Sequence, residues 1–145
     1  MVRETSVVTP ERFGQGFSYD DYLAQIKVNK DRFAGFYNGF ELKPEDAALF
    51  RALASRPNGP AKMLVLGEDW CGDVVRGLPV LARVAEAAGM AMSIFPRDLN
   101  HDIMNEFLKE GKYMSIHVAV FYTRDHRYIC HWIEKPAVAE RAFGE

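Results

Sequence analysis

The chain has 145 residues, of which 48% are hydrophobic, and this length suffices to bury one sizeable core, so we expect a single domain over residues 1–145. Its 18 basic and 20 acidic side chains give a net charge of -2, which provides no broad attraction to nucleic acid or anionic lipid. No apolar run approaches the roughly 18 residues of a membrane span, and the first residues lack the apolar stretch of a secretory leader. We therefore expect a cytoplasmic protein that binds neither nucleic acid nor membrane.

The two cysteines, Cys71 and Cys130, are too far apart and too few to indicate a disulfide framework or a zinc site. No two cysteine or histidine residues have the helical spacing of metal ligands. We expect two reduced thiols and no resident metal or cofactor.

The first third of the chain reads as an arm followed by helices. Up to about Gly16 there is no sustained hydrophobic period, which predicts a loop or arm. Ser18 precedes an apolar helical pattern that ends near Gly39, which predicts one amphipathic helix. Pro44 and the acidic residues after it suit the first turn of a second, shorter helix.

The segment Pro57-Asn58-Gly59-Pro60 separates this helical part, residues 1–60, from residues 61–145, where strands and helices alternate. We expect a central strand at 63–66, a helix from Asp73 to Ala88 that is kinked by Pro79, a strand at 91–95, a helix at 101–109 that ends at Gly111, and β-rich runs at 116–122 and 127–133. This order predicts a parallel strand pair and an antiparallel hairpin covered by helices.

The strand expected at 63–66 leads into Trp70-Cys71-Gly72-Asp73, and a helix follows with Pro79 eight positions after the cysteine. With this arrangement, residues 62–133 resemble the thioredoxin superfamily. With the preceding helices, the chain is similar to bacterial thioredoxin-like proteins that carry a helical N-terminal extension. The resemblance implies an α/β fold, with a thioredoxin-like mixed sheet flanked by helices, and leaves the function open.

Two positions depart from the superfamily pattern. The motif reads Cys71-Gly72-Asp73-Val74, so the second, resolving cysteine of a Cys-x-x-Cys pair is missing and a dithiol cycle within the motif is excluded. His117 stands where the superfamily has a cis-proline facing the motif. Because a cis bond before a non-proline residue costs about 2.5 to 4 kcal/mol, we expect the Ile116–His117 bond to be trans and the loop to be altered.

Cys71 is the candidate nucleophile, since a helix N-terminus stabilises a thiolate. Nearby carboxylates, including Glu68, Asp69 and Asp73, oppose this effect if they point at the sulfur. His117 favours the thiolate if its imidazole faces Cys71, and otherwise is a loop histidine bonded to solvent or backbone.

The resemblance places Trp70, Gly72 and Ile116 at the substrate-binding surface beside the thiol, although Trp70 is equally suited to covering the core. Cys130 alternates with aromatic residues along one strand, which predicts a buried structural thiol. The other histidines, at 101, 126 and 131, are expected to be surface polar groups.

Two functions remain open. In the first, Cys71 is the nucleophile of a monothiol redox or thiol-exchange protein, Asp73 or His117 transfers a proton, and the partner is a protein thiol or disulfide, glutathione or another external thiol. In the second, the protein is a non-catalytic binding module that uses the surface around Trp70, the His117 loop and the aromatic N-terminal helix. A relic cysteine that only fits a tight turn is compatible with the second function.

Overall fold

The structure is a computed structural model that describes residues 6–133. Its elements in chain order are α1 (Pro10–Phe13), α2 (Tyr19–Gln25), α3 (Lys30–Gly39), α4 (Pro44–Ser55), β1 (Lys62–Gly67), α5 (Gly72–Ala88), β2 (Ala91–Pro96), η1 (Arg97–Leu99), α6 (His101–Met104), β3 (Val118–Tyr122) and β4 (Tyr128–Ile133). Residues 134–145, which the sequence assigns to the same core unit, lie outside the described residues.

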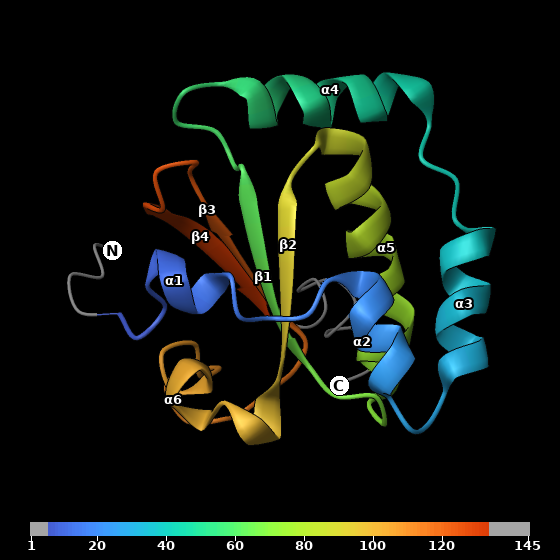
Figure 1. The fold of residues 1–145 in the computed structure, drawn as a ribbon, viewed down its shortest axis with the longest axis vertical. Helices are drawn as coiled ribbons and strands as arrows, with labels where there is room; N and C mark the ends of the chain where they lie inside the picture. The colour runs from blue at the N-terminus through green and yellow to red at the C-terminus, as the bar shows by residue number, and fades with distance from the viewer. Residues whose placement is uncertain (1–5, 134–145) are drawn as a thin grey trace.

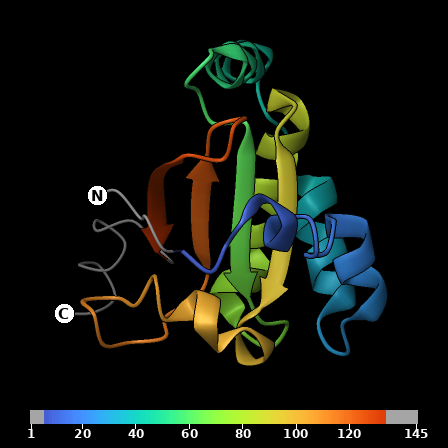
Figure 2. The ribbon, with the colours of Figure 1, turned by 60° about the vertical axis from the view of Figure 1, so that its left-hand side comes forward.

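The four strands form one mixed sheet in the order β2-β1-β3-β4, and Figure 2 shows them side by side. β1 pairs with β2 in parallel, whereas the β1–β3 and β3–β4 pairs are antiparallel. The expected parallel pair and C-terminal hairpin are therefore confirmed. β1 is central and five of its six residues are buried, as its continuous apolar sequence predicts.

Helices cover both faces of the sheet. α5 lies behind the sheet in Figure 2; α3 packs alongside α5, and α4 lies across the C-terminal end of α5 (Figures 1 and 2). The opposite face carries α1 and, at one end, α6 (Figure 2). α5 buries Val74, Val75 and Leu78, and its Gly89 stop has a left-handed φ of 75°, as expected for a C-terminal glycine.

The expected long helix up to Gly39 is wrong, because the chain breaks it into α2 and α3. Ser18 does cap α2 by accepting a hydrogen bond from the Asp21 amide at 3.1 Å. The break falls at residues 26–29, where Ile26 is extended and Asn29 has a left-handed φ of 64°. Contacts with the distant Asp69, described below, replace the helical hydrogen bonds there, and no local periodicity reveals them.

The expected helix at 101–109 is also shorter, since α6 ends at Met104. The amides of Glu106 and Phe107 donate to carbonyls three residues back, which gives tight turns instead of a regular helix. Phe107 is 1% exposed, and its ring meets the His131 ring edge-on at 5.1 Å, so tertiary packing outweighs the local helical pattern.

The expected arm carries more structure than its sequence indicates. Thr9 caps α1, and beyond that helix Phe17 exchanges backbone hydrogen bonds of 2.8 Å with Ile94. This isolated antiparallel bridge lies on β2, the strand that ends the sheet order on that side. It covers part of a strand edge that would otherwise be available for pairing.

Candidate functional site at the start of α5

The chain turns sharply from β1 into α5, and Cys71 is the residue at which the helix begins. Its φ of -83° and ψ of 122° are extended, so it occupies the N-cap position. The Cys71 amide donates to the Glu68 carbonyl at 3.3 Å, and the Cys71 carbonyl accepts from the Val75 amide at 2.9 Å. Gly67 permits the turn, because a side chain there would come within 2.9 Å of Val74.

The sulfur of Cys71 is half-buried and faces the loop before β3. Its Sγ lies 4.0 Å from the carbonyl oxygen of Ile116, to which the protonated thiol donates a weak hydrogen bond. The structure therefore brings together two residues that the sequence assigns to the site.

The acidic side chains near the motif in sequence are engaged elsewhere. The Asp69 carboxylate accepts hydrogen bonds from the Lys27 and Val28 amides at 2.9 and 3.3 Å, and the Asp69 carbonyl accepts one from the Asn29 side chain at 2.8 Å. These three bonds connect the α2–α3 junction to residues 68–71, the turn between β1 and α5 that we call the cysteine turn.

The other two carboxylates also have partners of their own. Glu68 accepts from the Asp98 amide at 2.8 Å, and Asp73 forms an ion pair with Arg76 at 3.2 Å. In this structure Glu68 therefore holds the backbone at Asp98, and Asp73 pairs with the Arg76 cation. Each of the three carboxylates therefore has a partner other than Cys71.

Trp70 is a surface residue, with 55% of its area exposed. The Arg97 guanidinium lies over its ring at 5.2 Å and also donates to the Met114 carbonyl at 3.0 Å. Arg97 thus links the tryptophan to the loop that leads to Ile116, a role that its sequence position gave no reason to expect. Gly72 is uncrowded, since the nearest atom to an added Cβ, apart from its chain neighbours, is in the Arg76 side chain at 3.8 Å.

The Ile116–His117 peptide bond is cis, so the expected trans bond is wrong. That expectation included only the energetic cost of the cis bond and left out the packing of the His117 side chain, which is 3% exposed. Its ring meets the Trp132 ring edge-on at 5.2 Å, and it lies so close to Gly77 that an added Cβ would overlap it. Gly77 is six residues, about 9 Å of helix rise, beyond Cys71, so the ring packs further along α5 than the sulfur.

Tyr22 of α2 is a residue near the thiol that sequence reasoning missed. It is 1% exposed, and burial raises the pKa of its phenol; the charges of Asp69, Glu68 and Cys71 raise that pKa further. The phenol therefore stays protonated as a hydrogen-bond donor on the buried side of the cysteine turn. Its position in an amphipathic helix is typical of a core residue, so only the fold reveals its proximity.

Cys130 is exposed, so the expected buried thiol is wrong. It is opposite Phe121 in the β3–β4 register, five residues or about 16 Å of strand beyond Ile116. It borders an apolar groove of about 370 Å³ whose wall also includes Leu53, Leu81 and Ile129. Partial burial raises the pKa of the Cys130 thiol. This separation from Cys71 far exceeds the reach of a disulfide.

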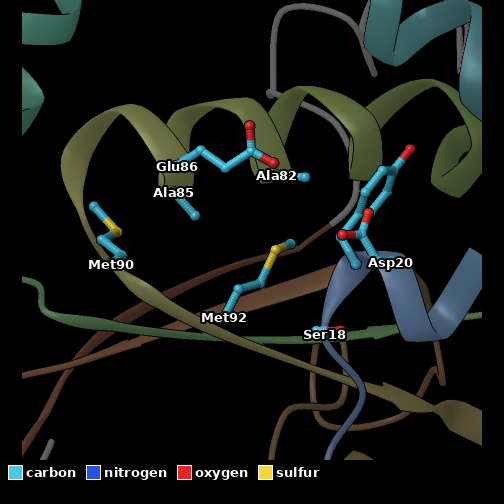
Figure 3. A pocket seen from close by; sticks show the side chains of 8 residues that line it. Ser18, Asp20, Ala82, Ala85, Glu86, Met90 and Met92 are labelled. Atoms are coloured by element: carbon cyan, nitrogen blue, oxygen red, sulfur yellow. The ribbon is translucent and has the colours of Figure 1, made fainter.

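A second cavity, of about 220 Å³, lies between α2, the C-terminal half of α5 and the start of β2 (Figure 3). Asp20 and Glu86 lie on opposite sides of it, with the Met92 side chain between (Figure 3). It lies away from the start of α5 and contains none of the residues assigned to the site.

Among residues 6–133 there is no group of three or more histidine, cysteine, aspartate or glutamate side chains able to hold a metal ion. Within the same range, no helix has the length and apolar character needed to cross a membrane.

Comparison with known proteins supports the fold. A family described as Thioredoxin matches residues 16–144. A solved protein of unknown function from Pseudomonas aeruginosa is 17% identical with a TM-score of 0.72, covering 94% of this chain and 82% of its own. An HIV epitope-scaffold is 16% identical with a TM-score of 0.73, covering 92% of this chain and 80% of its own. A search of curated proteins finds no match.

The two structural likenesses, each below 20% identity, establish the shared fold alone. The family match spans most of the chain and includes both the cysteine turn and the cis-bonded loop that faces it. This chain therefore belongs to the thioredoxin family.

Proposed function

We propose that this protein is a monothiol thiol-exchange protein in which Cys71 is the nucleophile and an external thiol, such as glutathione, completes the cycle. The observation that carries the proposal is the placement of Cys71: it is the half-buried N-cap of α5, with the uncrowded Gly72 after it and the Ile116 backbone opposite its sulfur. Unpaired amide hydrogens and the positive end of the helix dipole stabilise the thiolate that attacks a disulfide.

The exchange balances without any other redox group. The Cys71 thiolate attacks one sulfur of a disulfide R–S–S–R′, forms Cys71–S–S–R and releases R′–S⁻, which takes up a proton. A glutathione thiolate then attacks the sulfur of R, which frees Cys71 and leaves R joined to glutathione. A second glutathione reduces that product, so the two electrons come from two glutathione molecules. Such a cycle suits a cytoplasmic location, where glutathione keeps thiols reduced.

Proton transfer is assigned to Asp73 or His117 within this proposal. Asp73 shares its charge with Arg76, while His117 is buried against Gly77, so each reaches the thiol only through a local rearrangement or an intervening water. The variants Asp73→Asn and His117→Gln distinguish these two candidates. Substitution of the residue that transfers the proton should change the pH profile of exchange, and substitution of the other should not.

The test uses a glutathionylated peptide as substrate and glutathione as reductant. We expect Cys130→Ser to retain turnover and Cys71→Ser to lose it, and mass spectrometry should find the mixed disulfide on Cys71. Turnover by Cys71→Ser, or a mixed disulfide only on Cys130, would contradict the proposal.

A binding module is the second candidate, favoured by large apolar side chains exposed near the cysteine turn. Trp70 is 55% exposed and Met114 38% exposed, and Arg97 contacts both residues. Such side chains anchor protein interfaces. Binding of a partner that Trp70→Ala abolishes and Cys71→Ser leaves intact would favour this function over thiol exchange.

A further inference from the structure

A cavity of about 230 Å³ lies beside the cysteine turn and contains none of the residues used in the proposed exchange. It is enclosed by α2, the cysteine turn and the segment in which β2 leads into η1, and we call it the acidic cavity. Its wall includes Tyr22, Ile26, Glu68, Asp69, Asp98 and Leu99. Asp69 is two residues before Cys71, so their Cα atoms are at most about 7.6 Å apart. A group bound in the acidic cavity is therefore close to the thiol.

The three carboxylates of the acidic cavity each have an oxygen to offer. The contacts described above use Oε2 of Glu68 and Oδ2 of Asp69, and Asp98 pairs with Arg97 through its Oδ1 at 2.9 Å. Among residues 6–133, the second oxygen of each carboxylate has no hydrogen-bond or ion-pair partner. Lys27 also lines the cavity, so with Arg97 two cations oppose three carboxylates and one negative charge remains. The cavity therefore favours a positively charged donor.

Tyr22 is an independent indication of a ligand. Its side chain is 1% exposed and lines the acidic cavity, and within the described part of the chain its hydroxyl has no hydrogen-bond partner. The charges of Asp69 and Glu68 add to burial in raising the pKa of this phenol, so the hydroxyl lies near the same carboxylates. A buried hydroxyl without a partner costs free energy, which a bound N–H group recovers by donating to the phenol oxygen.

The rest of the wall determines the shape of the ligand. Ile26, Pro96 and Leu99 contribute apolar surface between the polar groups. A long side chain with an aliphatic stem and a cationic end suits this combination, because the stem packs on apolar surface while the cation reaches the carboxylates. Lysine and arginine have this chemistry. The ammonium of glutathione does not, since the carboxylate on the same carbon is repelled by the cavity.

We propose that the acidic cavity binds a lysine or arginine side chain of the disulfide substrate, which makes basic polypeptides the preferred partners of Cys71. This inference rests on the proposed function for its chemistry and on the acidic cavity for its selectivity. An extended peptide advances about 3.3 Å per residue, so a basic residue two or three positions from the substrate cysteine spans the distance from the sulfur to the cavity.

The test uses three peptides that carry lysine, methionine or glutamate two residues before and two residues after a single cysteine, which is joined by a disulfide to thionitrobenzoate. The Cys71 thiolate attacks the peptide sulfur, forms a mixed disulfide with the peptide and releases the coloured thiolate, the better leaving group. With Cys130→Ser protein we expect the lysine peptide to react about 3- to 10-fold faster than the methionine peptide, and the glutamate peptide to react slowest. The rate of each peptide with free glutathione corrects for its intrinsic reactivity.

Variants assign this preference to the acidic cavity. Glu68→Gln and Tyr22→Phe keep the shape of the side chain, and each should lower the ratio of lysine-peptide to methionine-peptide rates by about twofold or more, while the methionine peptide still reacts. Asp20→Asn is the matched control, because it removes one negative charge at the second cavity (Figure 3) and should leave the ratio unchanged. Lys27→Met removes a competing cation and should raise the ratio, which tests the cavity even if the other variants fail to fold.

A binding measurement separates this inference from the proposed function. Calorimetry with Cys71→Ser protein and peptides that have serine in place of cysteine measures binding without exchange. We expect the lysine peptide to bind about 3- to 10-fold more tightly than the methionine peptide, whether or not Cys71 reacts with any disulfide. Equal affinities and equal corrected rates for the two peptides would overturn the role of the acidic cavity, and a lack of reaction with all three peptides would contradict only the proposed exchange.

Discussion

The two cysteines of this chain occupy contrasting regions. Cys71 is framed by backbone: a helix start, an open glycine and the Ile116 carbonyl. Cys130 is on β4, the last described strand of the sheet order, beside an apolar groove. The comparison shows that the two sulfurs differ in their main-chain surroundings, because Cys71 begins a helix whereas Cys130 is an exposed residue within a strand.

The largest expected effect comes from restoring a second sulfur to the motif. In Val74→Cys the new thiol stands three residues after Cys71 at a helix start, where side chains lie on one face about 5 to 6 Å apart. We expect an intramolecular disulfide to form with Cys71 on mild oxidation. Thiol titration should then leave one free cysteine, Cys130, and the Val74→Cys/Cys71→Ser protein should keep both of its thiols. Three free thiols in oxidised Val74→Cys would contradict the geometry of the turn.

A second test compares the packing around Gly77 in α5, beside the cysteine site, with the packing around Gly35 in α3. A methyl group in Gly77→Ala would overlap the His117 ring, so we expect a loss of about 1 to 3 kcal/mol in the free energy of unfolding, measured with urea. Gly35→Ala in α3 is the matched control, since nothing lies within 4 Å of its added Cβ. It should stabilise the protein by up to about 1 kcal/mol through helix propensity. Equal changes in the free energy of unfolding for the two variants would show that the His117 loop moves to accommodate the added methyl group.

The third prediction compares the thiols directly. Burial raises the pKa of Cys130, so its thiolate fraction near neutral pH is reduced, whereas Cys71 has the helix N-terminus beside it. We expect iodoacetamide at pH 7.5 to modify the Cys130→Ser protein, which keeps Cys71, several times faster than the Cys71→Ser protein. A faster reaction at Cys130 would remove the physical basis of the proposed nucleophile.

The smallest effect concerns the Arg97–Trp70 contact beside Cys71. A double-mutant cycle with Arg97→Ala and Trp70→Ala should give a coupling of about 0.5 to 1 kcal/mol in urea unfolding, typical of an exposed cation–π pair. The cycle of Arg127→Ala with Trp70→Ala is the control and should give no coupling, because Arg127 belongs to the β3–β4 hairpin and pairs with Asp125. Equal coupling in both cycles would rule out a specific contact.

Most of the sheet and the cysteine turn were predictable from sequence, because their signals are local. The buried run at β1, the Pro44 helix start and the Gly89 helix stop each depend on a few adjacent residues. The break at Asn29 and the early end of α6 were not predictable, since they depend on bonds to Asp69 and on the burial of Phe107.

The candidate site divides in the same way. Cys71, Trp70 and Gly72 follow from one contiguous motif, and their expected placement at a helix start agrees with the structure. The surroundings of His117, the nearness of Tyr22 and the position of Arg97 depend on which helix or loop faces them. The periodicity of the sequence predicts whether such residues are buried or exposed, but it does not identify the residues that surround them.

The three hydrogen bonds received by Asp69 have a consequence for how this protein is divided into parts. They join residues 27–29, which precede the Pro57-Asn58-Gly59-Pro60 segment, to the residue two places before Cys71. A shortened chain that starts at Ala61 would keep every strand of the sheet and still lose the partners of Asp69. The N-terminal helices are therefore a structural component of the thiol site. Residues 61–133 transplanted into another protein would contain Cys71 without the hydrogen bonds that hold Asp69 beside it.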